Sequence, residues 1–233
     1  MVPLDHKETY RSETENYDQL ITREDFQGNI LREIERICPP DGLDILDLGA
    51  GTGRFETMLA GRAASLTAVD LSHAMLEIAR EKLVKLGTNN FHLTSGDHRL
   101  LPLRSQNFDL VISGWSICYL ADWYPETWRG ELDKAFTEIR RVIRPGGRVI
   151  LLETQGTGFK NPTPPPHLTS YFDYLQEAGF QYSWVRTDYH FTDLDEAVSI
   201  SRFFFGEELA ARVRANDWIV LPECTGFWTK TLP

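Results

Sequence analysis

Cysteine patterns that would define a metal site or a disulfide framework are missing from this sequence. The three cysteines, Cys38, Cys118 and Cys224, stand far apart, and no C-x-x-C pair occurs. The spacing therefore indicates neither a zinc site nor a set of disulfide bonds. The six histidines show no ligand spacing such as H-E-x-x-H either. We expect no bound metal ion, and reduced thiols in a cytoplasmic protein.

Basic charge and long apolar runs are also scarce. The sequence has 24 Lys and Arg residues against 34 Asp and Glu residues, a formal net charge of -10. Broad contact with nucleic acid needs clustered basic residues, so we expect no nucleic-acid partner. No apolar run approaches the length of a membrane span, and the first residues, MVPLDHKETYRSE, lack the apolar core of a secretion signal. A small molecule is the expected partner.

Short apolar runs alternate with longer amphipathic stretches from Asp44 onward. That alternation is typical of α/β proteins with a doubly wound, mostly parallel sheet and helices on both faces. We expect an N-terminal helical extension or cap over residues 1–40 and one main domain over 41–233, with a helical insertion at about 192–216. The expected strands are 44–48, 65–69, 91–94, 108–113, 148–152, 181–188 and 218–229. Helices are expected at about 26–38, 53–60, 126–143, 168–178, 194–205 and 207–216, with one more between the second and third strands.

The most informative segment is I-L-D-L-G-A-G-T-G-R, residues 45–54. Glycine at this density lets the backbone turn sharply off a strand, where a side chain would collide with a ligand. The turn presents unpaired N–H groups at a helix N-terminus, which suits an anionic or electron-rich ligand. The dinucleotide-binding fingerprint G-x-G-x-x-G would need glycine at position 54, which is Arg54. The spacing here is G-x-G-x-G, with Asp47 two places before the first glycine.

Polar residues also end the next three expected strands. Asp70 comes about twenty residues after the glycine turn, the interval at which an acidic side chain reaches a ribose diol. Asp97 follows the third strand, and Ser113 ends the fourth. Because the carboxyl ends of parallel strands form one edge of a sheet, we expect a single ligand site there.

Together these motifs resemble the first motifs of class I S-adenosylmethionine-dependent methyltransferases, in particular the small-molecule branch that includes ubiquinone and menaquinone biosynthesis enzymes. The resemblance covers about Tyr17 to Leu152 and includes the segment F-T-E-I-R-R-V-I-R-P-G-G-R-V from Phe136 onward. It implies a single-domain Rossmann-like fold with a seven-stranded sheet, S-adenosylmethionine as cofactor, and methyl transfer to a small molecule.

The resemblance also implies a cofactor-binding role for a defined set of residues. Asp47 and the glycine-turn backbone would hold the methionine part, and Asp70 the ribose hydroxyls. Leu71 and Met75 would cover the adenine faces, while Asp97 and the His98 amide would read the adenine edge. Met75 as a core residue, Asp47 as a turn cap and Tyr17 as a packing residue are the simpler alternatives. The full set is Tyr17, Asp47, Gly49, Ala50, Gly51, Asp70, Leu71, Ser72, Met75, Gly96, Asp97, His98 and Ser113.

An aromatic-rich segment follows the fourth strand. The chain reads I-S-G-W-S at residues 112–116, without the Asn/Asp-Pro-Pro-aromatic turn of many enzymes that methylate DNA bases or amide nitrogens. Trp115 and Tyr119 stand nearest the strand end, and we expect them to contact a planar or apolar acceptor. Trp123 and Trp128 fit core packing equally well.

The sequence shows no acid–base motif, and methyl transfer depends mainly on alignment of the two reactants. His190, after the sixth strand, is the candidate for an assisting base, with a structural role as the alternative. Residues 156–167 form a lid or a proline-stiffened connector. Phe203–Phe205 pack in the core or form part of a homodimer surface.

Two other functions compete with methyl transfer. A nucleotide-cofactor oxidoreductase shares the fold, and Arg54 in place of the third glycine argues against it. A non-catalytic module that binds S-adenosylmethionine is the second. The acceptor and its nucleophilic atom are not indicated by the sequence.

Overall fold

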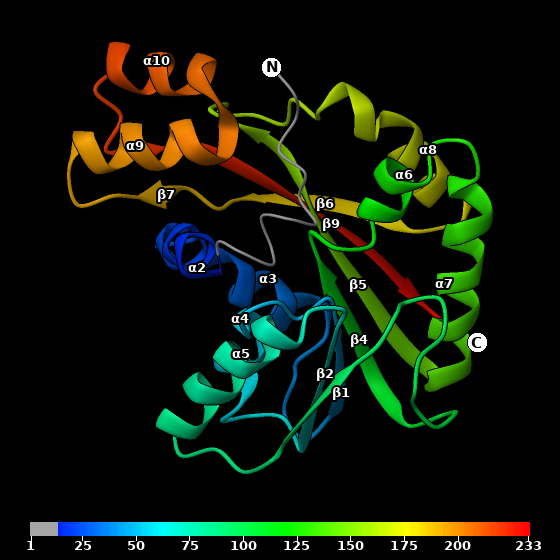
Figure 1. The fold of residues 1–233 in the computed structure, drawn as a ribbon. Helices are drawn as coiled ribbons and strands as arrows, with labels where there is room; N and C mark the ends of the chain where they lie inside the picture. Colours follow the sequence, from blue (N-terminus) through cyan, green and yellow to red (C-terminus); the bar gives the residue numbers. More distant parts are fainter. Residues whose placement is uncertain (1–13) are drawn as a thin grey trace.

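The computed structural model describes residues 14–233, with side chains from residue 18 onward, and it centres on one sheet (Figure 1). The sheet comprises β1 (Asp44–Leu48), β2 (Ser65–Asp70), β3 (Phe91–Ser95), β4 (Phe108–Gly114), β5 (Ile143–Thr157), β6 (Gln181–Arg186) and β9 (Glu223–Thr231). Its strand order is β3-β2-β1-β4-β5-β9-β6. Only β9 runs antiparallel to its neighbours β5 and β6. The predicted α/β class and seven-stranded, mostly parallel sheet are confirmed.

Helices cover both faces of this sheet, as the alternating pattern predicts (Figure 1). One face carries α3 (Asn29–Ile37), α4 (Arg54–Leu59) and α5 (His73–Lys85). The other carries α6 (Tyr119–Trp123), α7 (Trp128–Val142) and α8 (Thr169–Glu177), which follows the short 3-10 helix η1 (Pro166–Leu168). The pattern did not predict α6 or the first described helix, α2 (Thr14–Arg23).

Successive side chains of the central strands point to opposite faces of the sheet, so the interior has two apolar cores. Ile112 of β4 is fully buried in a cluster with Ile34 of α3 and Phe55 of α4. Its neighbour Val111 points the other way, into a cluster with Phe136 of α7. The sheet is therefore apolar on both faces, as expected of central parallel strands.

A third core lies beyond the sheet. The strands β7 (Tyr189–His190) and β8 (Val220–Leu221) pair with each other, and α9 (Leu194–Phe205) and α10 (Glu207–Ala215) connect them. Leu20 of α2 belongs to the same apolar cluster. Figure 1 shows α9 and α10 above β7, on the side where α2 lies. Phe204 and Phe205 pack against this cluster, whereas Phe203 is exposed.

The expected final strand is two strands. Pro222 lies between β8 and β9 and has no backbone N–H. The proline indicates an edge or a bulge. β9 lies between β5 and β6, so it is not at an edge, but its pairing with β5 shifts register between Thr154 and Thr157, beside the proline. The proline precedes the first residue of β9, Glu223, so it removes no hydrogen bond from the ladder.

β5 is longer than the predicted 148–152. Its pairing with β4 shifts between Phe108 and Leu110, so Arg144-Pro145-Gly146-Gly147 forms an irregularity within an extended segment. At its other end, β5 continues to Thr157, into the expected lid or connector. No helix of residues 14–233 has the length and apolar character needed to cross a membrane.

Removal of side-chain volume from the centre of the sheet tests this packing. We expect Ile112→Ala to lower the free energy of unfolding by about 2–5 kcal/mol, because it leaves a cavity between β4 and the helices α3 and α4. Val84→Ala, at an exposed position of α5, is the control and should change stability by less than about 0.5 kcal/mol. Urea denaturation measures both; equal midpoints for the two variants would contradict the assigned core.

Candidate functional site

The glycine turn after β1 passes directly beside the turn after β4. Gly49, Gly51 and Gly53 all have positive φ angles, between 55° and 83°. A Cβ atom on Gly49 would overlap the Ser116 side chain, and one on Gly53 would lie 2.8 Å from the Cβ of Ala79. Glycine is therefore required here both by conformation and by space.

Asp70, the last residue of β2, holds this turn from the neighbouring strand. Its Oδ2 accepts a hydrogen bond from the Gly51 N–H (2.9 Å), and its Oδ1 accepts one from the Ser72 N–H (2.7 Å). Burial raises the pKa of the Asp70 carboxyl, against the lowering effect of these backbone N–H donors. Each carboxylate oxygen keeps a further lone pair for a ligand hydroxyl.

Two buried carboxyl groups, those of Asp47 and Glu56, lie beside the glycine turn. Neither residue exposes more than 2% of its surface. None of their four carboxyl oxygens has a hydrogen-bond partner among the described residues. Burial raises the pKa of Asp47 well above its usual value and that of Glu56 to about 7, and nearby Asp70 adds to both shifts.

The carboxylate after β3 is already bonded within the chain. Asp97 accepts hydrogen bonds from the Arg99 N–H (2.8 Å) and from the Arg99 guanidinium (2.6 and 2.9 Å). The guanidinium lowers the pKa of Asp97. Arg99 also reaches Glu131 of α7 at 2.6 Å. Any ligand donor at Asp97 therefore shares this carboxylate with Arg99.

His98 connects the turn after β3 with the turn after β4. Its Nε2 lies 2.9 Å from the Ser116 Oγ, the same side chain that limits the space at Gly49. Burial lowers the pKa of His98 to about 4, so the imidazole is neutral at physiological pH. At the other predicted glycine, Gly96, a Cβ would lie 2.9 Å from Pro102.

The remaining predicted cofactor residues differ in accessibility. Leu71 is 57% exposed, whereas Met75 is only 1% exposed and packs in the interior. Ser113 is buried and donates to the Leu48 carbonyl (2.7 Å), and Ser72 accepts from the Met75 N–H at the start of α5. The backbone N–H of Ala50 donates to the Val69 carbonyl at 3.1 Å. Tyr17 lies in α2, and its side chain is outside the described residues.

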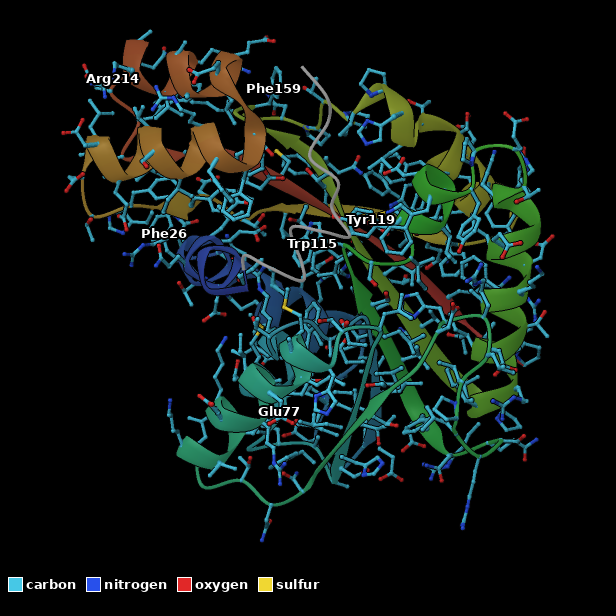
Figure 2. All side chains as sticks on the ribbon, viewed as in Figure 1. Phe26, Glu77, Trp115, Tyr119, Phe159 and Arg214 are labelled. Carbon is cyan, nitrogen blue, oxygen red and sulfur yellow. The ribbon has the colours of Figure 1, made fainter. Side chains whose placement is uncertain are left out.

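Trp115, directly after β4, is held on several sides. Its φ of 49° is unusual for a bulky residue, and its N–H donates to the Leu152 carbonyl at 2.7 Å. The ring stacks on Phe55, and the Arg54 guanidinium lies 4.8 Å from the ring centroid. Arg54 in turn forms a buried ion pair with Glu24 at 2.6 Å. Figure 2 labels Trp115 and Tyr119, which stacks on Trp123.

Residues 46–151 match a protein-family profile described as a methyltransferase domain. The chain is 30% identical over 165 residues to a demethylmenaquinone methyltransferase of Lactococcus lactis, covering 68% of this chain and 60% of that protein. It is 34% identical over 123 residues to a malonyl-[acyl-carrier protein] O-methyltransferase of Methylococcus capsulatus, covering 52% and 40%. It thus spans about 40–60% of the length of these two curated relatives. The chain is thus similar to S-adenosylmethionine-dependent methyltransferases over its central part.

Solved structures of methyltransferases share the fold. A methyltransferase from Aquifex aeolicus aligns with a TM-score of 0.56 and 18% identity, covering 87% of both chains. A phosphoethanolamine N-methyltransferase 2 of Haemonchus contortus, solved with S-adenosyl-L-methionine, aligns with a TM-score of 0.57 and 20% identity. That alignment covers 88% of this chain and 52% of the other.

The residues at this sheet edge fit S-adenosylmethionine. The partnerless carboxyl oxygens of Asp47 match a ligand ammonium group, since a buried acceptor without a donor is costly. Asp70 keeps lone pairs for a ribose diol. Within residues 14–233, no group of three or more His, Cys, Asp or Glu side chains is arranged to hold a metal ion.

The structure places His190 after β6, as the sequence predicts. It lies on β7, outside the seven-stranded sheet, and its ring packs 5.0 Å from that of Phe26. β6 ends at Arg186, and the chain then pairs with β8. The role of His190 as an assisting base stays a prediction.

Sequence reasoning missed three buried carboxyl groups. Glu56 is one, and Glu153 and Glu223 near the end of β5 are two others. Glu153 accepts from the Tyr171 hydroxyl (2.9 Å), and burial raises its pKa to about 7. Glu223 accepts from the Thr154 hydroxyl (2.7 Å), and burial raises its pKa to about 8. The available signal was a charged residue within or directly after an apolar run.

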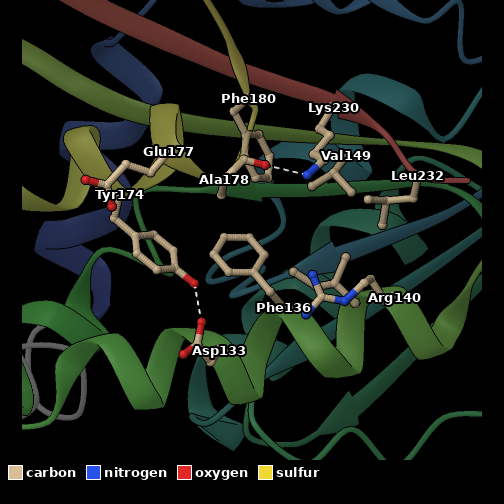
Figure 3. A pocket seen from close by; sticks show the side chains of 11 residues that line it. Asp133, Phe136, Arg140, Val149, Tyr174, Glu177, Ala178, Phe180, Lys230 and Leu232 are labelled. Atoms are coloured by element: carbon tan, nitrogen blue, oxygen red, sulfur yellow. Dashed lines mark hydrogen bonds between the residues drawn. The ribbon is translucent and has the colours of Figure 1, made fainter.

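A cavity of about 330 Å³ lies elsewhere, between α7 and α8 (Figure 3). Phe136 and Phe180 line it, together with Val149 near the middle of β5 and Leu232 just after β9. Across it the Tyr174 hydroxyl donates to Asp133 at 2.5 Å. None of the predicted cofactor or acceptor residues lines this cavity, so we do not assign it to methyl transfer.

Alanine at the glycine turn tests the geometry of the site. We expect Gly49→Ala to weaken S-adenosylhomocysteine binding by at least about tenfold, because the new Cβ forces the turns after β1 and β4 apart. Calorimetric titration measures the affinity. Gly130→Ala is the control: it lies in α7 with no atom near the new Cβ, so binding should be unchanged. Wild-type affinity in Gly49→Ala would refute the close approach.

Proposed function

We propose that this chain transfers a methyl group from S-adenosylmethionine to a small-molecule acceptor by in-line displacement. The observation that carries the proposal is the meeting of three features at the carboxyl ends of β1 and β2. These are the glycine turn, the Asp70 carboxylate bonded to it, and the buried Asp47 carboxyl without a partner. No feature of the described site calls for hydride transfer, and Arg54 occupies the position of the third dinucleotide-binding glycine.

The proposed cofactor pose follows from these contacts. Asp70 accepts from both ribose hydroxyls, and Asp47 faces the methionine ammonium group. The exposed Leu71 covers one adenine face, whereas the interior position of Met75 favours a supporting role. Asp97 and the His98 amide read the adenine edge, with Arg99 holding the Asp97 carboxylate in place. Gly49, Ala50 and Gly51 supply backbone to the methionine part.

Residues 1–40 are proposed to act as a cap on this site. Asp18 of α2 accepts from the Thr52 hydroxyl at 2.8 Å and forms an ion pair with Lys82 of α5. Arg23 forms a second ion pair, with Glu196 of α9, at 2.7 Å. These contacts support closure of α2 over the glycine turn, and they join the cap to the helical insertion at about 192–216.

Alignment is the proposed source of catalysis. Bound S-adenosylmethionine supplies an electrophilic methyl carbon on a sulfonium. Holding an acceptor about 3–3.5 Å from such a carbon can supply roughly 7–11 kcal/mol of the barrier. Trp115, fixed by Phe55 and Arg54, is proposed as a wall of the acceptor site, with Tyr119 beside it. We assign no general base.

The acceptor class is proposed from the aromatic wall and the charge of the chain. A planar or apolar small molecule fits Trp115 and Tyr119, and a net charge of -10 disfavours nucleic acid. Relatives named for demethylmenaquinone and for malonyl-[acyl-carrier protein] methylation support a small-molecule or carrier-bound acceptor. A cytoplasmic location and a homodimer remain predictions from the sequence.

The Asp70→Ala variant tests the cofactor pose. We expect its affinity for S-adenosylhomocysteine to fall by about tenfold to several hundredfold, since hydrogen bonds to a charged group contribute about 1.5–3 kcal/mol each. Asp41→Ala, which removes a surface ion pair with Arg62, should bind normally. Calorimetric titration measures both variants, and unchanged affinity in Asp70→Ala would remove the ribose assignment.

Transfer itself is tested with radiolabelled S-adenosylmethionine and fractionated metabolite extracts. We expect wild-type protein to label a small molecule in at least one fraction, and Asp70→Ala to label it far more slowly. Tight cofactor binding with no labelled product across all fractions would favour a non-catalytic binding module.

A further inference from the structure

Asp47 and Glu56 face each other in the interior beside the glycine turn. Asp47 is the fourth residue of β1, and Glu56 lies in the first turn of α4. Their carboxyl groups are within hydrogen-bonding reach of each other. Two carboxyl groups can share such a bond only when one of them carries a proton.

The surroundings offer this pair no compensating cation. The other charged group that acts on both carboxyls is Asp70 of β2, which is also acidic. Arg54 of α4 is bonded to Glu24, and Lys82 of α5 is paired with Asp18. Within residues 18–233, no donor of another residue bonds to any of the four oxygens, and the Glu56 backbone N–H lowers the pKa of its own carboxyl. Two negative charges enclosed in this way are strongly unfavourable.

Burial and mutual repulsion both favour retention of a proton near neutral pH. Burial and the Glu56 charge raise the pKa of Asp47 well above its usual value, and burial and the Asp70 charge raise that of Glu56 to about 7. Because the two groups are coupled, the proton belongs to the pair rather than to one residue. The pair therefore carries one negative charge instead of two when no ligand is bound.

We propose that Asp47 and Glu56 form a proton-sharing pair that receives the ammonium group of the methionine moiety and gives up its proton as that group binds. This inference rests on the proposed function. On binding, the pair loses one proton to solvent, and the ligand ammonium takes the place of that proton as the positive partner. No bond to carbon or sulfur forms or breaks. Glu56 is a positioning residue in this scheme.

The pair makes cofactor binding depend on pH in a defined direction. Below the pKa of the pair, ligand binding must expel a proton, so affinity rises with pH. The dissociation constant of S-adenosylhomocysteine should fall by up to about tenfold per pH unit between pH 6 and the pKa of the pair, and level off above it. A ligand without the ammonium group, such as 5′-methylthioadenosine, should show no such dependence.

Calorimetric titration in buffers of different ionisation enthalpy tests the proposal at pH 6.5. We expect wild-type protein to release nearly one proton per S-adenosylhomocysteine bound and none with 5′-methylthioadenosine. In Glu56→Gln, Asp47 loses its acidic neighbour and ionises at lower pH, so proton release should disappear. The affinity of this variant should vary by less than about threefold between pH 6 and 8.

Glu223→Gln is the matched control, because it removes a different buried carboxyl whose pKa is raised, to about 8. It should keep wild-type proton release. Glu56→Thr serves as a second variant if the glutamine protein melts early, and it should also release no proton. Ligand binding by wild-type protein without proton release would overturn the pair and leave the proposed function standing. Absence of S-adenosylhomocysteine binding by wild-type protein would overturn both.

Discussion

The close approach of two turns governs the rest of this site. The backbone leaving β1 at Gly49 lies against Ser116, which follows β4, and no side chain fits between them. Ser113 strengthens the same junction by bonding across to the Leu48 carbonyl, and Asp70 ties the turn to β2. Adjacent parallel strands can present several polar groups to one ligand only when their connections are held this close. The glycine motif is therefore a packing requirement as well as a binding motif.

Burial of these acidic groups lowers the stability of the folded chain at neutral pH. The carboxyls of Asp47 and Glu56 bind protons more tightly in the folded than in the unfolded chain, as does that of Glu153. The contribution of Glu56 and Glu153 to stability is therefore full below the unfolded pKa near 4.5 and is lost as the pH rises through about 7. A purely structural interior would carry apolar side chains at these positions. For Asp47 and Glu56 the arrangement fits the proposed cationic ligand, since no cation of residues 18–233 is paired with these carboxyls.

Local sequence patterns predicted most of the fold, because the alternation of apolar and amphipathic segments, the glycine turns and the helix ends all depend on residues close in sequence. β1 and α9 occupy the predicted residues, and β2, β3, β4 and α10 differ by one residue. The predictions failed where distant segments decide. Pro222 indicated an edge or a bulge, and only the irregular pairing with β5 is found, because β6 lies beyond β9. The last two residues of the predicted sixth strand, Thr187 and Asp188, lie outside β6, and the chain then pairs with β8. The position of the proposed ligand site at the carboxyl ends of the strands was likewise predictable from Asp70. The place of Glu56 beside Asp47 was not, because it depends on how α4 packs against the sheet.

A crystal structure of this chain with S-adenosylhomocysteine tests the central claim most directly. The account predicts both ribose hydroxyls on the Asp70 carboxylate, the ligand ammonium within hydrogen-bond distance of Asp47, and the ligand sulfur facing Trp115. A ligand bound in the cavity between α7 and α8, or one whose ribose and ammonium groups contact neither aspartate, would contradict it.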